Sequence, residues 1–128
     1  DFLKVNIDEL FLLNQLFDLN ISNTQKLSES ICKMYNLDYL CITNGSVDST
    51  IYDGTNFYKI NSFSVKSIDS VGAGDSFLAA FVSNFFFEKV NIHESLRIAS
   101  AYGALTSAKK GATPNISNQE IKNFIKNS

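Results

Sequence analysis

Short apolar runs typical of buried strands alternate along this chain with longer segments of helical periodicity. Residues 2–6 and 38–43 are runs of strand length, and residues 50–52 and 56–60 flank a turn at Asp53-Gly54, as the two strands of a hairpin do. Two helical segments lie between the first two runs, and three more follow the hairpin. This order predicts an α/β fold, and it is typical of half of a layered sheet rather than of a self-contained one.

The first two helical segments have predictable starts and apolar faces. Asp8 is expected to cap the first helix, and the second begins near Ser22 or Asn23. The apolar residues at helical spacing are Leu10, Leu13, Leu16 and Phe17 in the first helix and Leu27, Ile31 and Met34 in the second. Residues 64–68, after the hairpin, are expected to add one more extended piece.

Three more helices are expected in the second half of the chain. Apolar residues occupy nearly all sides of residues 74 to about 89, which predicts a buried helix. The next helix is expected from Asn91 or Ile92 to Lys109, because Gly111 and Pro114 stop it. The last begins at about Ser117 and turns three apolar side chains inward, those of Ile121, Phe124 and Ile125.

Composition excludes several classes of partner and compartment. The chain has 128 residues, of which 45% are hydrophobic, and its net charge of −2 argues against nucleic acid or an anionic membrane surface as a partner. No apolar run approaches the roughly 18 residues that span a bilayer. Cys32 and Cys41 match no metal-ligand spacing, and we expect two buried, reduced thiols and a cytoplasmic location.

The chain begins on Asp1-Phe2-Leu3, without an initiator methionine and already inside a strand pattern. We therefore expect these residues to be part of something longer. The aromatic content of 12%, mostly phenylalanine, fits this expectation. Part of the phenylalanine-rich surface would pack against the absent part and would form an exposed apolar patch without it.

Residues 69–82 carry the most chemical information. A Gly-Ala-Gly turn, Gly72 to Gly74, leads directly into a helix, so the free N–H groups of the first helical turn converge where the backbone is least obstructed. With the helix dipole, these groups form an anion site suited to phosphate. Asp75 lies at the mouth of this site, where a carboxylate is useful if it faces a hydroxyl that must lose a proton during attack on phosphorus. The alternative is that Asp75 merely caps a helix and that the glycines merely form a turn.

The sequence from Asp69 to Asp75, Asp-Ser-Val-Gly-Ala-Gly-Asp, resembles the second signature of the PfkB/ribokinase family of carbohydrate kinases. The small-small-apolar run Ala79-Ala80-Phe81 follows at the spacing of that family. The resemblance implies that Asp75 is the base that deprotonates the sugar hydroxyl. It also implies that the amides of Gly72, Ala73 and Gly74 hold the phosphoryl group in transfer.

Two elements of the first half resemble nucleotide-binding elements of the same family. Asn6-Ile7-Asp8-Glu9 is similar to the Asn-x-x-Glu element, which implies that Asn6 meets the nucleotide phosphates and that Glu9 helps to hold Mg²⁺, through water. Thr43-Asn44-Gly45-Ser46 resembles the Thr-x-Gly nucleotide loop, which implies nucleotide contacts for Thr43, Gly45 and Ser46. By the residues alone, Glu9 is equally an ordinary acid of a first helical turn, and Asn44-Gly45 a plain turn.

The segment Lys109 to Pro114 resembles the family's loop near the purine and a monovalent cation. The resemblance implies K⁺ ligands at the Asp69 side chain and at the backbone carbonyls near Val71, Thr106, Lys109 and Gly111, with Asn115 as a further position. Ser100 falls beside the expected adenine pocket, although a solvated helix position is the alternative for it.

Over its whole length the chain resembles the C-terminal half of such a kinase, so residues 1–128 form one nucleotide-binding half of a ribokinase-like three-layer α/β/α sandwich. The N-terminal half, with its sugar-binding motif and lid, has no counterpart here, and we expect little turnover from this half alone. The ending Gly-Ala-Thr-Pro and the stretch Ala101 to Ala104 are most similar to fructokinases. The implied partners are ATP, Mg²⁺, K⁺ and a sugar, with a homodimer for the full-length protein.

Three alternatives remain open. A ribose, nucleoside or ketodeoxy-sugar-acid kinase of the same family would differ in the sugar-binding residues of the other half. A non-catalytic nucleotide-binding module is the second alternative, and the presence of Asp75 and Glu9 argues against it. The third is a structural α/β domain whose glycines serve only as turns.

Overall fold

The computed structural model describes residues 1–69, 71–109 and 116–128. The chain divides into two compact units, Asp1–Lys59 and Ile60–Ser128. Within the described ranges the first unit is built from strands and two helices. The second unit begins with the last two residues of a strand and otherwise contains only helices. This is the mixed α/β class that the order of apolar and helical segments predicted.

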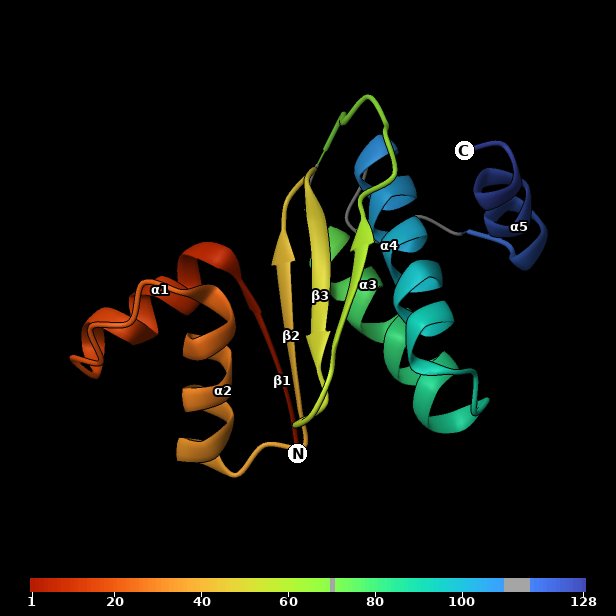
Figure 1. Cartoon of the computed structure of the whole chain (residues 1–128). Coiled ribbons are helices and arrows are strands. Elements are labelled where there is room, and N and C mark those ends of the chain that lie inside the picture. Colours follow the sequence, from red (N-terminus) through yellow and green to blue (C-terminus); the bar gives the residue numbers. More distant parts are fainter. Residues whose placement is uncertain (70, 110–115) are drawn as a thin grey trace. The chain divides into compact units, whose positions relative to one another are not determined.

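A four-stranded sheet forms the first unit, with the strands in the order β1-β2-β3-β4 (Figure 1). The strands are β1 (Phe2–Asn6), β2 (Tyr39–Asn44), β3 (Asp48–Tyr52) and β4 (Phe57–Asn61), the last of which runs across the boundary between the units. β1 and β2 are parallel, and Asn6 pairs with Thr43 at their carboxyl ends. The expected hairpin is confirmed, because Asp53 accepts the backbone N–H groups of Thr55 and Asn56 and so closes the turn between β3 and β4.

Helices α1 (Ile7–Leu16) and α2 (Thr24–Tyr35) lie on one face of this sheet, between β1 and β2 in the chain (Figure 1). The hydrophobic core of the unit lies between these helices and the strands. Its buried members are Val5, Leu10, Leu27, Ile31, Cys32, Leu40, Ile42 and Tyr52. The parallel β1–β2 pair with its helical connection is the arrangement that brings the carboxyl ends of the two strands to one edge.

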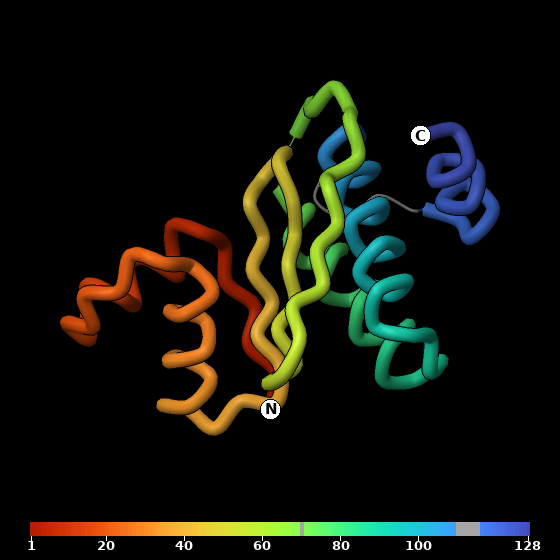
Figure 2. The backbone as a smooth tube through the Cα atoms, in the orientation of Figure 1, coloured from red at the N-terminus to blue at the C-terminus, as the bar shows by residue number. Residues whose placement is uncertain are grey.

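The expected cap on Asp8 is wrong, because α1 begins two residues earlier. β1 leads directly into the helix (Figure 2), and Asn6 is its N-cap. The Asn6 side chain accepts the Glu9 N–H, and the Glu9 side chain accepts the Asn6 N–H, each at 2.8 Å. This reciprocal capping box satisfies two donors at once, which a cap on Asp8 would not do.

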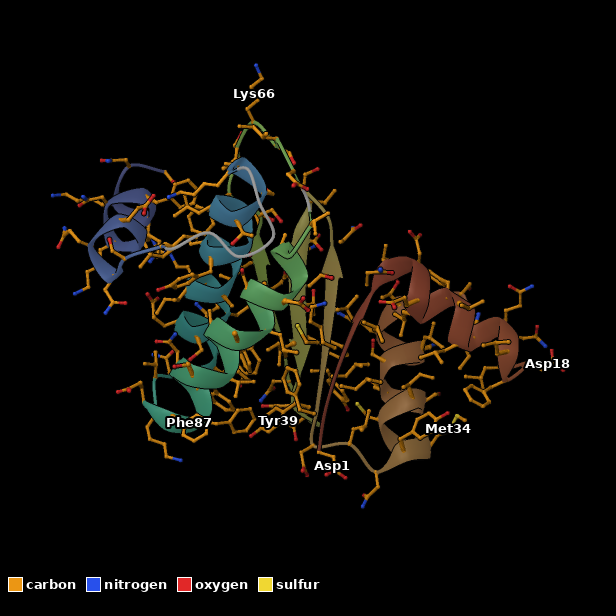
Figure 3. The ribbon with its side chains drawn as sticks, turned by 180° about the vertical axis from the view of Figure 1, so that it is seen from behind. Asp1, Asp18, Met34, Tyr39, Lys66 and Phe87 are labelled. Atoms are coloured by element: carbon orange, nitrogen blue, oxygen red, sulfur yellow. The ribbon has the colours of Figure 1, made fainter. Side chains whose placement is uncertain are left out.

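The apolar stripes of α1 and α2 extend beyond the core that they cover. Leu10 is buried and Leu13 packs against the core, but Leu16 and Phe17 at the end of α1 are exposed. In α2, the cap on Asn23 is confirmed, whereas Met34 (Figure 3) is 47% exposed. All three exposed residues lie in the last turn of a helix or just after it.

The second unit consists of α3 (Ala73–Val82), a π-helical turn η1 (Ser83–Phe87), α4 (Ile92–Ala108) and α5 (Asn118–Lys126). Ser117 caps α5, as expected. Residues 62–69 form no strand, so the extended piece expected over residues 64–68 is wrong as a strand. Gly111 and Pro114, expected to stop α4, lie outside the described residues, and α4 ends at Ala108 with Lys109 as its C-cap.

The helix expected to be buried over residues 74–89 differs in shape and in exposure. The α-helical part ends at Val82, and η1 carries three successive phenylalanines, of which Phe87 (Figure 3) is 76% exposed. A π-helical turn rotates the following side chains relative to an α-helix, so the apolar residues do not continue along the buried face. Phe77 and Phe81 are buried on that face.

Both cysteines are buried and free, as predicted. Burial raises the pKa of the Cys32 thiol to about 11 and that of the Cys41 thiol to about 12. Exposed phenylalanines and leucines of the kind that the composition suggested are present at Phe11, Leu12, Leu16, Phe17 and Phe87. No helix in the described part of the chain is both long enough and apolar enough to cross a membrane.

Candidate active site

The turn before α3 presents free backbone amides. Gly72 is the N-cap with φ +84°, a left-handed conformation that favours glycine. The first helical bond runs from the Ser76 N–H to the Gly72 carbonyl at 2.9 Å. Among the described residues, none accepts a hydrogen bond from the amides of Ala73, Gly74 and Asp75, and no side chain caps the helix. These donors are therefore available to an anion.

Asp75 is the third residue of α3 and is exposed. Its carboxylate forms no hydrogen bond or ion pair with the residues that the structure describes. The positive end of the helix dipole stabilises a negative charge at this position. An exposed carboxylate with no partner among the described residues is chemically able to accept a proton from a hydroxyl placed beside it.

Asp69 is held close to the C-terminal turn of α4. The backbone N–H groups of Ile68 and Asp69 both donate to the Ser107 carbonyl, at 2.7 and 3.0 Å. The Asp69 side chain accepts the Val71 N–H at 3.0 Å, which turns the chain toward Gly72. The structure thus holds Asp69, and through it Val71, beside the end of α4, while their contact with K⁺ stays a prediction.

Two of the other expected K⁺ ligands, Thr106 and Lys109, are also at this end of α4. The Thr106 carbonyl accepts the Lys109 N–H at 3.2 Å, and the Thr106 hydroxyl is buried with no hydrogen-bond partner among the described residues. An orphaned buried oxygen in a region with a carboxylate and backbone carbonyls fits a hard cation. Gly111 and Asn115 lie outside the described residues, so the structure does not place them.

Lys109 has a partner that the sequence did not indicate. Its ammonium group lies 2.5 Å from the Glu120 carboxylate of α5, and both side chains are about one-third exposed. Ten residues separate Lys109 from Glu120 in the chain, so the spacing of residues along a helix could not indicate this ion pair. The pair ties the end of α4 to α5.

Ser100 lies in α4 and is buried, so the solvated helix position considered for it is wrong. It is one turn of helix from Gly103 and two from Ser107, on the same face of α4. A buried serine on this side is consistent with a position beside a pocket, but its contact with adenine stays a prediction.

The nucleotide-binding residues expected in the first unit meet at one edge of its sheet. Asn6 and Thr43 are paired residues at the carboxyl ends of β1 and β2. β2 ends at Asn44, and Gly45 follows with φ +50° in a turn closed by the Val47 N–H on the Asn44 carbonyl. Ser46 is exposed in this turn. Ligands of α/β proteins bind at such carboxyl edges.

Glu9 is engaged in the capping box by one carboxylate oxygen, which leaves the second oxygen for a water molecule or a metal. In the described ranges no group of three or more histidine, cysteine or acidic side chains could hold a metal by itself. A Mg²⁺ held by Glu9 through water and by nucleotide phosphates needs no such group, because Mg²⁺ commonly keeps several waters.

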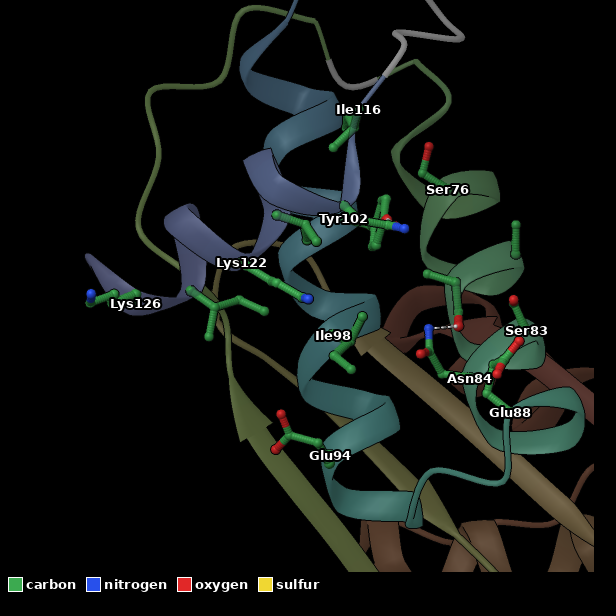
Figure 4. A pocket seen from close by; sticks show the side chains of 15 residues that line it. Ser76, Ser83, Asn84, Glu88, Glu94, Ile98, Tyr102, Ile116, Lys122 and Lys126 are labelled. Atoms are coloured by element: carbon green, nitrogen blue, oxygen red, sulfur yellow. Dashed lines mark hydrogen bonds between the residues drawn. The ribbon is translucent and has the colours of Figure 1, made fainter.

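A separate open cavity of about 1020 Å³ lies within the second unit (Figure 4). α3, α4 and α5 contribute its lining, with Glu88 and Glu94 among the acidic residues and Lys122 and Lys126 among the basic ones. None of the residues expected at the active site is among its described lining. The sequence analysis did not indicate this cavity, because it depends on how the three helices pack and not on a local motif.

This chain matches a known protein family and is similar to several plant proteins. A family model described as pfkB family carbohydrate kinase matches residues 1–119. Fructokinase-2 of Oryza sativa subsp. japonica is 30% identical over 120 residues, which cover 89% of this chain and 34% of that protein. Fructokinase of Solanum tuberosum is 34% identical over 85 residues, which cover 62% of this chain and 27% of that protein. The chain thus spans well under half the length of these relatives.

Solved structures share the fold. Ribokinase of Thermotoga maritima aligns with a TM-score of 0.86 at 23% identity, over 98% of this chain and 42% of that one. A fructokinase of Xylella fastidiosa with bound ATP aligns with a TM-score of 0.79 at 22% identity, over 99% and 42%. Phosphofructokinase-2 of Escherichia coli in complex with potassium has a TM-score of 0.79 at 21% identity, over 99% and 40%. Nearly the whole chain therefore has the ribokinase-like fold, and it corresponds to less than half of each of these structures.

Proposed function

Because this chain belongs to the pfkB family of carbohydrate kinases, we propose that it contributes the nucleotide-binding half of an enzyme that transfers a phosphoryl group from ATP to a sugar hydroxyl. The fructokinase relatives favour fructose as the sugar. The observation that carries the proposal is the turn before α3, where free amides and an unpaired carboxylate occupy consecutive positions. Residues 1–128 would then act as one half-site and would show little turnover alone.

In the proposed reaction the sugar hydroxyl attacks the γ-phosphorus of ATP and the bond to the β-phosphate oxygen breaks. Asp75 accepts the hydroxyl proton, an electron pair of the attacking oxygen forms the new P–O bond, and ADP leaves with the electron pair of the broken bond. The amides of Gly72, Ala73 and Gly74 donate to the oxygens of the group in transfer. Donors fixed by a helix start need no reorganisation as the charge develops.

Asn6 and Glu9 at the start of α1, with Thr43, Gly45 and Ser46 after β2, are proposed to hold the nucleotide phosphates and the metal. Mg²⁺ bound there would neutralise charge on the β- and γ-phosphates. The side-chain Nδ2 of Asn6 would donate to a phosphate oxygen, while its Oδ1 caps the helix, so the two tasks use different atoms. Ser100 is proposed to lie at the adenine ring.

K⁺ would be held by the Asp69 side chain with carbonyls near Val71, Thr106, Lys109 and Gly111, and would shield charge beside the anion-binding turn. The unpartnered Thr106 hydroxyl supports a cation in this region. Asp69 both takes part in this ligand set and fixes Val71, one residue before Gly72. A cation there would therefore be coupled to the geometry of the amide turn.

Titration calorimetry of the chain with ATP–Mg²⁺ tests the proposal, with AMP as the control. We expect saturable binding of ATP and at least about tenfold weaker binding of AMP, because the proposed contacts are to the β- and γ-phosphates. Equal affinities would indicate adenine recognition without the anion-binding turn. Absence of saturable ATP binding would contradict the proposal and favour a structural domain. Binding together with full activity of Asp75→Asn in the complete enzyme would favour other catalytic residues.

A further inference from the structure

Gly103 lies in the middle of α4, where glycine is an unfavourable residue. It is the twelfth of seventeen residues in this helix, and glycine there costs stability relative to alanine. A Cβ atom built on Gly103 would lie 3.4 Å from the Ala73 carbonyl oxygen and 3.6 Å from the Phe77 Cβ. The first turn of α3 therefore packs closely against the backbone of α4 at Gly103.

Ser107 lies one turn later in α4, at the spacing that places two residues on the same face. Its carbonyl is among the last four of the helix, which have no partner within the helix. It accepts the N–H groups of Ile68 and Asp69, at 2.7 and 3.0 Å. One carbonyl thus holds both residues that lead into the segment before α3.

These two contacts lie on the two sides of the amide turn. The Ser107 carbonyl binds the chain before the turn, at residues 68–69. Gly103 packs against the helix after the turn, at Ala73 and Phe77. We propose that one face of α4, formed by Gly103 and the Ser107 carbonyl, positions the amides of residues 72–74 and the Asp75 carboxylate. The inference deepens the proposed function, because it names the residues that position the anion-binding turn.

The size of residue 103 is the quantity that matters. Alanine adds only a Cβ, which meets its neighbours at ordinary van der Waals distances. Valine places two further carbon atoms about 1.5 Å beyond this Cβ, toward a backbone carbonyl and the base of a phenylalanine that cannot rotate away. The first turn of α3 must then move, and its amides move with it.

The test compares Gly103→Val with Gly103→Ala and with Ala104→Val, in the chain of residues 1–128. Ala104→Val carries the same side chain at a position rotated by about 100° around α4. We measure amide ¹H–¹⁵N resonances of residues 72–75 without ligand, melting temperature, and affinity for ATP–Mg²⁺ by calorimetry. Gly103→Ser, which adds one atom beyond Cβ, replaces Gly103→Val if that variant does not fold.

We expect Gly103→Val to shift the resonances of Gly74 and Asp75 and to weaken ATP–Mg²⁺ binding by at least about tenfold, since small displacements of positioned groups are costly. Gly103→Ala and Ala104→Val should bind within about twofold of the unchanged chain. Hydrogen exchange should also be slower at the amides of Ile68 and Asp69 than at Ser67, because the Ser107 carbonyl protects them.

Two outcomes would overturn the inference. One is a folded Gly103→Val with unshifted resonances and unchanged affinity, and the other is fast exchange at both Ile68 and Asp69. Failure of the proposed function has a different signature. In that case the unchanged chain does not bind ATP–Mg²⁺, while the ligand-free resonances and the exchange rates still decide whether α4 positions the turn.

Discussion

Asn6 caps α1 in the structure and is proposed to contact the nucleotide phosphates, and two substitutions can separate these tasks. Its Oδ1 atom accepts the Glu9 N–H at 2.8 Å, while Glu9 accepts the Asn6 N–H through its own side chain. Asn6→Ala removes the cap and the amide donor. Asn6→Asp keeps an oxygen that caps the helix equally well but replaces the donor by a negative charge.

The expected magnitudes follow from these contacts. Loss of an N-cap side chain costs about 1 kcal/mol, and the entropy of unfolding of a chain of this length is about 270 cal/mol/K, so Asn6→Ala should lower Tm by about 4 °C. Asn6→Asp should leave Tm nearly unchanged. Its charge lies close to the proposed phosphates, and a repulsion of about 1.4 kcal/mol would weaken ATP–Mg²⁺ binding about tenfold.

Asn23 supplies the matched control, because it caps α2 through the Lys26 N–H at 2.9 Å and has no proposed nucleotide contact. Asn23→Ala should lower Tm to a similar extent, and neither Asn23→Ala nor Asn23→Asp should change the affinity for ATP–Mg²⁺. Differential scanning calorimetry and isothermal titration calorimetry give the two quantities. An Asn6→Asp variant that binds ATP–Mg²⁺ as tightly as the unchanged chain, at low and at high salt, would refute the phosphate contact. An unchanged Tm for Asn6→Ala would refute the capping argument.

Three further predictions concern the amide turn and the buried thiols. In the complete enzyme, Asp75→Asn should lower kcat by about 10²–10⁴ with nearly unchanged ATP affinity, as steady-state kinetics would show, because a positioned base acts only on the reaction step. Gly72→Ala should destabilise the chain by about 1 kcal/mol in urea titrations, because φ is +84° there; equal stability would contradict the left-handed cap. Burial raises the pKa of Cys32 to about 11 and that of Cys41 to about 12, so the native state retains thiol protons that the unfolded chain loses above about pH 9. This contribution to stability is complete below pH 9 and is lost as the pH rises toward 11, so Tm should fall over this range, and it should fall less in Cys32→Ala.

Local signals in the sequence predicted much of the fold. The strand runs, the Asp53-Gly54 hairpin and the helix starts near Asn23 and Ser117 are all present, because each depends on residues within a few positions of one another. The first helix shows the limit of such signals. Asp8 and Asn6 are both good caps, and the choice between them depends on where β1 ends beside β2, a contact with residues more than thirty positions away.

Exposure was the less predictable property. Leu16, Phe17, Met34 and Phe87 are apolar and lie in helical patterns, yet each is exposed. A helical stripe predicts which side chains share a face, but not how far along the helix that face is covered. At Phe87 the change from α- to π-helix also rotates the side chain, and nothing in the residue pattern of 83–87 indicated it.

The sequence by itself determined the chemistry of the turn before α3, because Gly72 can take the left-handed conformation, Asp75 supplies the carboxylate, and both properties belong to single residues. Only the tertiary structure decided where that turn is held. The Ser107 carbonyl and the bare backbone at Gly103 meet residues about thirty to forty positions earlier in the chain, and neither contact leaves a pattern in the sequence around it. Every residue has a backbone carbonyl, so the residue type of Ser107 does not indicate its contact. The role of a glycine in a helix depends on which atoms pack against it, and only the tertiary structure shows these.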